Sequence, residues 1–525
     1  MPRVPDNDDI DLFVVGGGIN GTGIARDAAG RGLSVVLCEQ GDLASATSSA
    51  STKLIHGGLR YLEYYEFRLV RESLSERETL LKLAPHIIRP LRFVLAHDKH
   101  QRPAWLIRLG LFLYDHLGGR EVLPGCQGIS FADHPTGRDL VPGFTKGFVY
   151  SDCWVDDARL VVLNAMSARE QGAEILTRTR CSGARREDGR WLVTLSPRDG
   201  GPERTLRAKV LINAAGPWAG DFLSETLDDA SPHPLRLVKG SHIVVPRLFD
   251  HDYAYIFQNP DGRIVFAIPY EADFTLIGTT DVDFSGDPSE ARASDGEIAY
   301  LCEAVNRYFQ TPTTPESVVW SFSGVRPLFG DPQKDPASLT RDYVLDVNTG
   351  GDGAAPPLLS VFGGKITTYR KLAEQVLSRL EPWLGSGKEA WTQRAPLPGG
   401  NMIGVGADQF LEEARVRYPW LDDKLLTRYV RAYGGRIRVL LTGAYAYEHL
   451  GVHFGGGLYE AEVRYLSDHE WAVSAEDILW RRSKLGLHVD AATVARLEAW
   501  LAEQTEPPAE AVPATRKTPP LARQA

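Results

Sequence analysis

A glycine-rich turn near the start of the chain constrains its fold more than any other feature. Residues 10–15 are rich in β-branched residues and predict a strand, and Gly16-Gly-Gly-Ile-Asn-Gly21 follows them directly. Residues 19–29 have a helical composition, and residues 33–38 predict a second strand that leads to Glu39. This order predicts a βαβ unit at the beginning of a large α/β domain.

The spacing Gly16-x-Gly18-x-x-Gly21 matches the fingerprint of a dinucleotide-binding turn. The first glycine allows the tight turn, the second lets a pyrophosphate approach the backbone, and the third lets helix and strand pack closely. The phosphates would lie at the positive N-terminus of the helix. Glu39 stands where an acidic residue accepts hydrogen bonds from ribose hydroxyls. An ordinary glycine-rich turn is the alternative, and the flanking strand, helix and acid favour the dinucleotide site.

The segment that follows favours FAD over NAD. Residues 42–53 are mostly small and hydroxylated, where an NAD-type domain would continue with further βαβ units. Such a segment can lay its backbone along an extended cofactor and offer hydroxyl donors to phosphate oxygens. A flexible linker is the alternative, but the segment lies between two glycine-punctuated motifs.

Composition and charge exclude several classes of protein. The chain has 525 residues, 43% of them apolar and 24% charged, which fits a folded protein of more than one domain. The formal net charge of −10 argues against a nucleic-acid partner held on a broad basic surface. The five cysteines lack C-x-x-C spacing, so we expect neither a disulfide framework nor a metal site. The polar N-terminus and the lack of any apolar run of about 18 residues predict an intracellular protein without a membrane span.

The rest of the body mixes strands and helices. We expect a helix over residues 60–83, a buried strand over 210–216, an antiparallel sheet over 240–282, and a strand at 358–362 before a helix from about 367 to 380. On the first helix arginines mix with glutamates, and we expect an ordinary solvated face formed by Glu66, Arg68, Arg71, Glu72, Glu76, Arg77 and Glu78.

The C-terminal part has a different composition, rich in Leu, Ala, Arg and Glu, and predicts a mainly helical domain over residues 401–503. Ser474-Ala-Glu-Asp477 and Asp490-Ala-Ala-Thr493 are typical of capped helix starts. Residues 504–525 are rich in proline and lack apolar periodicity, so they predict a disordered tail. Residues 105–117 fit either an amphipathic surface helix or a helix that faces the core.

Several longer motifs resemble one known family. They are Ser48-Ser-Ala-Ser-Thr-Lys-Leu-Ile-His-Gly-Gly-Leu-Arg60, Leu237-Val-Lys-Gly-Ser-His-Ile-Val-Val245, Ile277-Gly-Thr-Thr-Asp281, Ser323-Gly-Val-Arg-Pro327, Phe362-Gly-Gly-Lys-Ile-Thr-Thr-Tyr-Arg370 and, in the helical part, Ala475-Glu-Asp-Ile-Leu-Trp-Arg-Arg482. From about residue 9 to about residue 503 the chain resembles the FAD-dependent aerobic glycerol-3-phosphate dehydrogenases, within the D-amino-acid oxidase-like flavoprotein superfamily.

The resemblance implies an α/β fold: a Rossmann-like FAD-binding domain, an interleaved antiparallel-sheet substrate domain of α+β type, and the helical C-terminal domain. We expect the FAD-binding part at about 9–90, 151–230 and 340–385, and the substrate-binding part at about 91–150 and 231–339, within a body over residues 1–400. The implied activity is oxidation of sn-glycerol 3-phosphate to dihydroxyacetone phosphate, with hydride transfer to FAD and electrons passed to a membrane quinone. Peripheral attachment to the cytoplasmic membrane and a homodimer are implied as well.

The resemblance also implies substrate-binding residues, namely Arg60, Tyr61, Arg326, Arg341 and Lys365. Arginine suits a phosphate dianion because its planar fork donates two parallel hydrogen bonds. We expect Arg326, Lys365 and His56 to take part in catalysis. Oxidation at C2 also requires loss of the hydroxyl proton, and His56 and His242 are both candidate bases, since the ordinary pKa of histidine lies near neutral pH.

Expected cofactor-binding residues come from four parts of the chain: Gly16, Gly18, Asn20, Gly21, Glu39, Thr47, Ser48, Ser49, Thr52, Lys53, Gly57, Ala215, Gly216, Gly364, Lys365, Ile366 and Thr367. Residues 363–368 open a predicted helix, whose N–H groups and dipole would stabilise the negative charge at flavin N1 and O2 on reduction. A simple strand-to-helix turn capped by threonine is the alternative.

Three other functions stay open at this point. A glycerol-3-phosphate oxidase would use O2 as the acceptor, and residues that control O2 access cannot be identified from the sequence. A glycine- or sarcosine-type flavin amine oxidase would need only a carboxylate clamp and an uncharged amine pocket. A flavin-binding redox sensor would keep the fingerprint without needing Arg60, Arg326 and Lys365 together, so their joint presence favours an enzyme.

Overall fold

The predicted βαβ unit forms the start of the first sheet. In the computed structural model, which describes residues 9–98, 102–227, 235–329, 342–350, 353–402 and 406–505, it consists of β1 (Asp9–Val15), α1 (Ile19–Gly30) and β2 (Val35–Cys38). β1 pairs in parallel with β2 on one side and with β10 (Arg204–Asn213) on the other. The all-buried β2 fits a strand covered on both faces.

The first sheet has the strand order β17-β18-β10-β1-β2-β7, with an antiparallel extension from β10 through β9 to β8. Its further strands are β7 (Glu174–Leu176), β8 (Thr179–Glu187), β9 (Arg190–Pro197), β17 (Val344–Asn348) and β18 (Leu358–Phe362). β18, β10, β1, β2 and β7 run in parallel, and β17 is antiparallel to β18. Parallel strands place their carboxyl ends at one edge of the sheet, where ligands of such folds bind.

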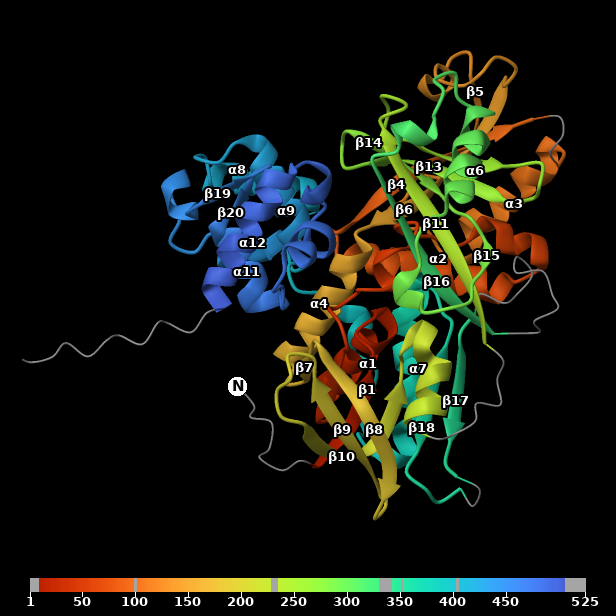
Figure 1. Ribbon diagram of the computed structural model, residues 1–525. Coiled ribbons are helices and arrows are strands. Elements are labelled where there is room, and N and C mark those ends of the chain that lie inside the picture. The colour runs from red at the N-terminus through yellow and green to blue at the C-terminus, as the bar shows by residue number, and fades with distance from the viewer. Residues whose placement is uncertain are drawn as a thin grey trace, which may run out of the picture.

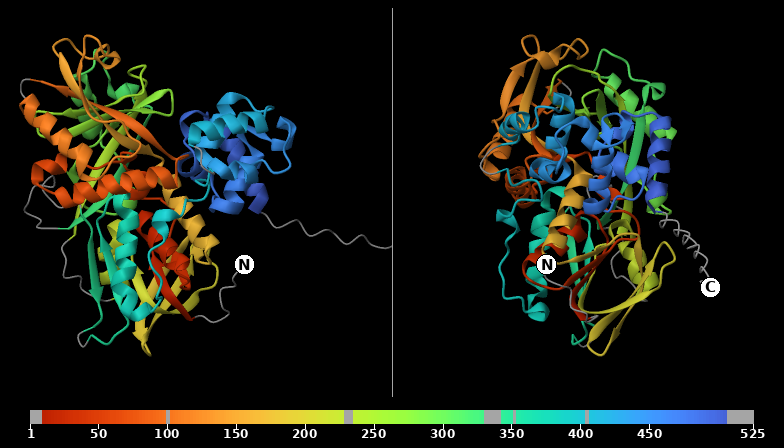
Figure 2. Two further views of the ribbon diagram at one scale, coloured as in Figure 1. Left: turned by 180° about the vertical axis from the view of Figure 1, so that it is seen from behind. Right: turned by 90° about the vertical axis from the view of Figure 1, so that its left-hand side faces the viewer.

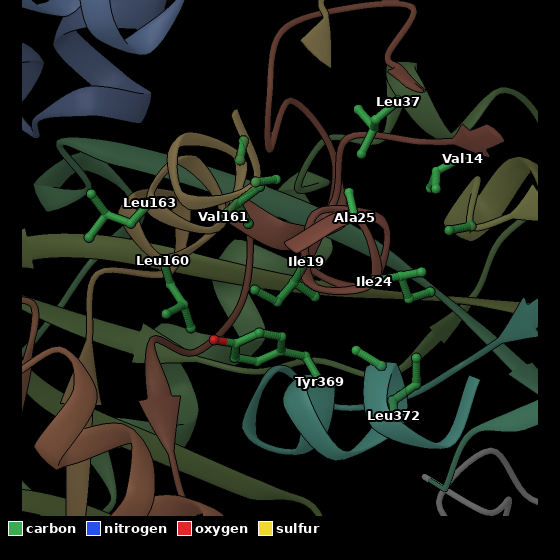
Figure 3. Close-up of a cluster of buried hydrophobic side chains, with 14 of the residues drawn as sticks. Val14, Ile19, Ile24, Ala25, Leu37, Leu160, Val161, Leu163, Tyr369 and Leu372 are labelled. Atoms are coloured by element: carbon green, nitrogen blue, oxygen red, sulfur yellow. The ribbon is translucent and has the colours of Figure 1, made fainter. Parts of the chain in front are cut away.

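Helices α1, α4 (Asp157–Glu170) and α7 (Tyr369–Leu384) pack together beside this sheet. Ile19 and Ile24 of α1 face Tyr369 and Leu372 of α7 in the largest buried cluster (Figure 3). A Cβ added at Gly23 of α1 would lie 2.7 Å from the Tyr369 ring, so glycine is needed for this close approach.

The second sheet is largely antiparallel, with the order β15-β11-β14-β13-β12-β4-β6-β3, and β16 and β5 pair with β11 and β6. Its strands are β3 (Leu54–Ile55), β4 (Ile88–His97), β5 (Gln127–Ser130), β6 (Lys146–Val155), β11 (Leu235–Pro246), β12 (Ala254–Gln258), β13 (Ile264–Tyr270), β14 (Phe274–Gly278), β15 (Val282–Asp283) and β16 (Trp320–Phe329). This confirms the antiparallel sheet expected around residues 240–282. Three longer helices accompany it: α2 (Phe67–Leu83), α3 (Ala104–Leu117) and α6 (Asp295–Asn306).

The helical end of the chain has its own buried core and packs against one side of the body, next to α4 (Figures 1 and 2). It comprises α8 (Ala407–Arg417), α9 (Asp423–Tyr433), α10 (Ile437–Leu440), α11 (Glu460–Glu470) and α12 (Ala491–Thr505), with a small β19–β20 ribbon (His453–Gly455, Leu458–Tyr459). Ser474 and Asp490 cap as predicted, because their side chains accept the N–H groups of Asp477 and Thr493. The predicted fold class is therefore confirmed. Residues 504 and 505 end α12, and the remainder of the predicted tail lies outside the described residues.

The expected helix over residues 60–83 is wrong at its start. Residues Leu59–Tyr64 form a 3-10 helix, η2, and α2 begins only at Phe67. Tyr65 between them has φ +59°, a left-handed conformation that cannot continue a helix, and the Glu66 N–H donates to the Tyr61 carbonyl.

The expected solvated face on this helix is also wrong in part. Arg77, Glu76 and Glu78 are 3%, 1% and 5% exposed. Glu76 pairs with Arg370 of α7 at 2.5 Å, and Arg77 pairs with Asp152 of β6 at 3.0 Å. Arg77 and Glu76 face the body because each finds a buried partner from another element, and Glu78 pairs with Arg77 beside it. Within the described residues, no helix has both the length and the hydrophobicity needed to cross a bilayer.

Candidate active site

The fingerprint glycines are required by steric contacts. Gly16 has φ +109°, and a Cβ there would lie 2.4 Å from the Ala214 carbonyl oxygen. A Cβ on Gly21 would lie 1.9 Å from the Gly16 carbonyl oxygen. Any side chain at either position would separate β1 from β10 or from α1, as expected for the first and third glycines of a dinucleotide-binding turn.

The N-terminus of α1 is open to an anion. Its N-cap residue, Gly18, offers no capping side chain, and the first turn carries no acidic residue. The Ile19 N–H donates to Ser48 Oγ at 3.0 Å, and a Cβ on Gly18 would meet only that hydroxyl, at 3.1 Å. Gly18 and Ser48 thus border a helix start whose N-cap residue has no capping side chain, which fits a pyrophosphate.

Glu39, at the end of β2, organises the adjoining turn. Its carboxylate accepts the Gly17 N–H at 2.7 Å and the Gly41 N–H at 2.8 Å. Burial raises its pKa despite these two bonds. The carboxylate is fixed beside the glycine turn, at the position expected to meet a ribose.

Residues 47–53 run between the two sheets. Thr47, in the 3-10 helix η1 (Thr47–Ser49), donates from Oγ1 to the Val325 carbonyl at 2.6 Å, and Ser49 donates from Oγ to the Ala46 carbonyl at 3.2 Å. A Cβ added to Gly324 would lie 2.9 Å from that of Ala50, so β16 and this segment are in close contact.

The far end of this segment is anchored by buried polar groups. Lys53, fully buried, donates from Nζ to Asp157 Oδ1 at 2.8 Å and to the Ser49 carbonyl at 3.0 Å. The Thr52 hydroxyl lies 3.0 Å from His242 Nε2. The side chain of Lys53 therefore fixes the course of the segment, and the ion pair makes a flexible linker untenable here.

A second glycine-rich turn meets the first helix. Gly363 and Gly364 have φ of +73° and +96°, and Asn20 Nδ2 donates to the Gly363 carbonyl at 3.2 Å. Asn20 Oδ1 is buried and has no hydrogen-bond partner among the described residues. An unpaired amide oxygen and an uncapped helix start at the same place fit a cofactor that supplies a donor and an anion.

The 3-10 helix η9 (Ile366–Thr368) and then α7 follow this turn. The alternative of threonine capping fails, because the α7 N-cap, Thr368, makes no side-chain capping bond. Thr367 Oγ1 instead accepts the His56 N–H at 3.3 Å. At the end of β10, the Ala215 N–H donates to Asn213 Oδ1 at 3.3 Å, and Gly216 has φ +57° with open space where its Cβ would be.

Lys365, Tyr61 and His56 come together at the second turn. Lys365 Nζ lies 3.7 Å from the centroid of the Tyr61 ring, a cation–π contact. Gly58 has φ +80°, and a Cβ there would lie 2.2 Å from the Tyr61 ring and 3.5 Å from Lys365 Nζ. Two segments distant in sequence, residues 56–61 and the turn at Lys365, thus place a cation, a tyrosine ring and an imidazole close together.

Arg326 lies on β16. Its Nη2 donates to Asp281 Oδ1 at 2.5 Å and to the Thr280 carbonyl at 3.1 Å, and its side chain is 29% exposed. A Cβ on Gly363 would be 3.5 Å from the Pro327 carbonyl, so the end of β16 adjoins the second glycine turn. Asp281 orients the guanidinium, a role not predicted from the sequence.

Two other predicted residues are not joined to this cluster by any described contact. The Arg60 guanidinium lies over the Tyr64 ring at 5.9 Å, with Nη2 3.4 Å from the Tyr64 hydroxyl. Arg341 lies outside the described residues.

Both candidate bases are neutral at pH 7. Burial and the positive charges of Lys365 and Arg77 lower the pKa of His56 to about 3. Burial, Lys53 and Arg326 lower the pKa of His242 to about 3 as well. Each ring therefore keeps a lone pair that can accept a hydrogen bond or a proton.

A buried polar network behind the site was missed by sequence reasoning. The Tyr114 hydroxyl lies 2.8 Å from both oxygens of Asp152 and accepts the Gly57 N–H at 2.8 Å, while Arg77 pairs with Asp152. It holds the turn between His56 and Gly58. The detectable signal was Asp152, an acid inside the strand pattern of residues 146–155.

Comparison with known proteins identifies the class. The model of the FAD dependent oxidoreductase family matches residues 11–370, and that of the C-terminal domain of alpha-glycerophosphate oxidase matches residues 390–503. With a fingerprint turn, an uncapped helix start and an acid at the ribose position, the chain is an FAD-dependent oxidoreductase, and its cofactor is FAD.

Individual relatives define the family more narrowly. The chain is 55% identical to a glycerol-3-phosphate dehydrogenase of Pseudomonas aeruginosa over 97% of each chain. It is 54% identical to a D-erythritol 1-phosphate dehydrogenase of Brucella abortus, over 93% of this chain and 97% of that one. The structure of a glycerol-3-phosphate dehydrogenase from Bacillus halodurans with FAD superposes with a TM-score of 0.75 at 28% identity, covering 94% of this chain and 90% of that one. The chain belongs to the FAD-dependent glycerol-3-phosphate dehydrogenase family.

Proposed function

We propose that this protein oxidises sn-glycerol 3-phosphate at C2 to dihydroxyacetone phosphate. The observations that support the proposal are the contact of Lys365 with the Tyr61 ring and the position of Arg326 on β16, the strand that adjoins the same glycine turn, beside the segments expected to bind the cofactor. Two cations and a hydroxyl suit a phosphate monoester, which carries up to two negative charges. FAD, when bound, accepts the hydride from C2.

Each residue has a distinct proposed role. Arg326, held by Asp281, would donate to the phosphate, and Arg60 and Arg341 would add to the attraction of the dianion. Lys365 would stabilise the developing C2 alkoxide, because its ammonium is fixed over the Tyr61 ring. The N–H groups that open η9 and α7 would stabilise negative charge on the reduced flavin ring.

His56 is the proposed proton acceptor. It is neutral because burial and nearby cations hold its pKa at about 3. A substrate dianion next to Lys365 would raise that pKa by offsetting the positive charge, so the base would strengthen only when substrate is bound. His242, whose Nε2 already meets the Thr52 hydroxyl, is better suited to holding the flavin segment.

The first test is anaerobic reduction of the bound flavin. We expect the yellow colour to bleach rapidly with sn-glycerol 3-phosphate, and the product to be dihydroxyacetone phosphate. D-erythritol 1-phosphate is the second candidate substrate, because the Brucella abortus relative is almost as similar to this chain. Faster bleaching by that compound, or by glycine or sarcosine, would replace the assignment of glycerol phosphate.

A membrane quinone is the proposed electron acceptor, reached by peripheral attachment to the cytoplasmic membrane. The supporting feature is the face of α3, where Trp105, Leu109 and Phe112 are 68%, 47% and 56% exposed while Leu111 and Tyr114 are buried. Tyr65, 80% exposed, lies in the neighbouring turn, and Arg102 pairs with Glu63 there. Aromatic and aliphatic side chains flanked by arginine are typical of a helix at a lipid interface.

The membrane contact is tested with vesicles that contain anionic lipid. Changing Trp105, Leu109 and Phe112 together to serine should release the protein from the vesicles without altering bleaching by substrate. Val416→Ser, which removes an even more exposed apolar residue, on α8, is the control and should leave binding intact. In the same assay, reoxidation by a quinone analogue should outpace reoxidation by O2; the reverse would make the protein an oxidase.

A homodimer is proposed on the family resemblance. Light scattering of the detergent-solubilised holoenzyme should give twice the mass of the chain, and a monomer mass would reject it.

A further inference from the structure

Residues 477–484 of the helical C-terminal domain form one of its contacts with the FAD-binding body, beside the ion pairs Arg159–Glu470 and Arg436–Glu170. The first six residues of this segment form a single turn of π-helix, η13 (Asp477–Arg482). This conformation is rare in proteins overall, but where it occurs it is often at a functional site. The wider turn presents Trp480, Arg481 and Arg482 in succession to the body.

One end of this segment grips the loop that follows Glu39. Arg482 donates from Nη1 and Nη2 to the two oxygens of Asp42 at 2.6 and 2.7 Å, and both side chains are almost fully buried. Arg481 donates from Nε to the same carboxylate at 2.7 Å. Asp42 lies three residues after Glu39, and the N–H of Ala44, in the same loop, donates to the Gly17 carbonyl at 3.2 Å.

Arg178 strengthens this grip from the strand side. Its N–H donates to the Gly41 carbonyl at 2.8 Å, and its Nη2 donates to Asp477 Oδ2 at 2.5 Å. The Val473 and Ser474 N–H groups also donate to Asp477, and with Arg481 and Arg178 they lower the pKa of Asp477 to about 2. The loop of residues 39–45 is therefore held from both sides while it packs on the glycine turn.

The other contact reaches the far end of the FAD segment through stacked rings. Trp480 stacks on Trp320 of β16 with ring centroids 4.4 Å apart, and Trp320 lies 4.8 Å from Phe322. Phe322 stacks on His242 at 4.9 Å and lies under Lys53 Nζ at 5.1 Å. Lys53 is the last residue of the FAD segment, and His242 contacts the Thr52 hydroxyl next to it.

We propose that residues 477–484 are a clamp through which the C-terminal domain positions FAD, by fixing both ends of the segment from Asp42 to Lys53. Residues 477–484 act on FAD through Asp42 and Trp320, so they are positioning residues and take no part in the chemistry. The proposal concerns FAD and holds whichever alcohol phosphate the enzyme oxidises.

A second buried ion pair between the domains gives a matched control. Arg159 of α4 pairs with Glu470 of α11 at 2.5 and 2.9 Å, and both are as buried as Arg482 and Asp42. Among the described residues, no hydrogen bond joins the Arg159 side chain to the segment from Asp42 to Lys53. Arg482 also donates to the Glu470 backbone carbonyl at 3.0 and 2.6 Å, and Arg159→Gln keeps that carbonyl and the hydrogen bonds of Arg481 and Arg482 to Asp42.

The test measures flavin binding by the full-length apoprotein. Binding is measured by the quenching of flavin fluorescence. Asp42→Asn should weaken FAD binding at least tenfold, while binding of FMN, which lacks the adenosine, should change less than twofold. Arg159→Gln should lower the melting temperature of the apoprotein by about as much as Asp42→Asn does, and it should leave FAD binding within twofold of the parent. Arg481→Gln, at a side chain 11% exposed, provides a milder variant if Asp42→Asn does not fold, with a severalfold loss of FAD affinity.

Trp480 tests the other end of the clamp. Trp480→Ala should weaken binding of both FAD and FMN severalfold, and Trp480→Phe should restore it, because a ring can still stack on Trp320. Equal FAD affinity in Asp42→Asn and the parent would overturn the proposal. So would an equal loss in Arg159→Gln, which would reduce the effect to general domain docking.

Discussion

The two ends of the FAD site are built from different materials. The nucleotide end consists of backbone: Gly16, Gly21, the open start of α1 and one carboxylate, Glu39, that accepts two N–H groups. The proposed substrate end consists of long charged side chains, Arg326 and Lys365, each held by a neighbour from another segment. Sterics therefore dominate at one end and electrostatics at the other, and substitutions at the two ends should fail in different ways.

The largest effect is expected from Gly21→Ala. The added Cβ would stand 1.9 Å from the Gly16 carbonyl oxygen, both backbone atoms are fixed, and α1 would have to move off β1. We expect no detectable FAD in the purified protein and a melting temperature near that of the apoprotein. Gly18→Ala, where the Cβ meets only the Ser48 hydroxyl, should fold normally and separate a steric effect on the fold from one on the cofactor. Yellow Gly21→Ala protein would contradict the steric account.

Arg326→Ala should be the next most damaging and should spare the cofactor. Loss of a charged hydrogen-bond donor to phosphate costs about 1.5–3 kcal/mol, which corresponds to a fall in kcat/KM of about 10- to 150-fold. Asp281→Asn, which frees the guanidinium without removing it, should give a smaller rise in KM. Steady-state kinetics together with the flavin content of each variant distinguish the two ends, since a parallel loss of FAD would make Arg326 structural.

Acid should destabilise the protein through two neutral histidines, His56 beside Lys365 and His242 beside the flavin segment. The pKa values of His56 and His242 are about 3 in the folded protein, below the ordinary value of 6.5, so the unfolded chain binds more protons between those values. The free energy of unfolding should then fall as the pH drops below about 6.5, by up to about 1.4 kcal/mol per pH unit for each histidine. His242→Asn should reduce that slope by one proton in urea unfolding series between pH 4.5 and 6.5. An unchanged slope would mean that His242 is protonated in the folded protein.

Glu39→Gln should have the smallest effect of the four. The amide keeps one acceptor for Gly17 or Gly41 but turns an NH2 group toward the other N–H, and it removes the charge that faces the ribose. We expect FAD affinity to fall about tenfold, the equivalent of one charge-assisted hydrogen bond. Titration of the apoprotein with FAD measures the change, and kcat of the saturated enzyme should be unaltered. A lower kcat at saturating FAD would show that the two ends are coupled.

The contrast between a site end built from one stretch of backbone and an end built from side chains of distant segments also explains what the sequence could predict. The nucleotide end lies within one contiguous stretch, so the spacing of Gly16, Gly18 and Gly21 was sufficient to predict it. Arg77 and Glu76 were misassigned because charge spacing on a helix looks identical whether its partners are water or residues far along the chain. Their partners, Asp152 and Arg370, belong to other elements, and no local pattern announces such pairs.

Helix α3 shows a third situation, in which the pattern is genuine but its orientation is not encoded locally. The periodicity of residues 105–117 allowed either a surface or a core-facing helix. In the structure one face buries Leu111 and Tyr114, and the opposite face exposes Trp105 and Phe112. Both faces are apolar, so only the position of the second sheet determines which one is covered.

The pairing of distant segments also orders events during protein synthesis. Val15 of β1 pairs with Asn213 of β10, and the Asp42 carboxylate pairs with Arg482, which is synthesised 440 residues later. At the usual 5–20 residues per second, the ribosome needs about 25–100 s to reach that arginine. Before residue 213 is made, the edge of β1 that pairs with β10 has no partner strand, and before residue 482 is made, the Asp42 carboxylate lacks its Arg482 partner. On the proposed clamp, a fragment cut before residue 482 should therefore bind flavin more weakly than the full chain even where its sheets have formed.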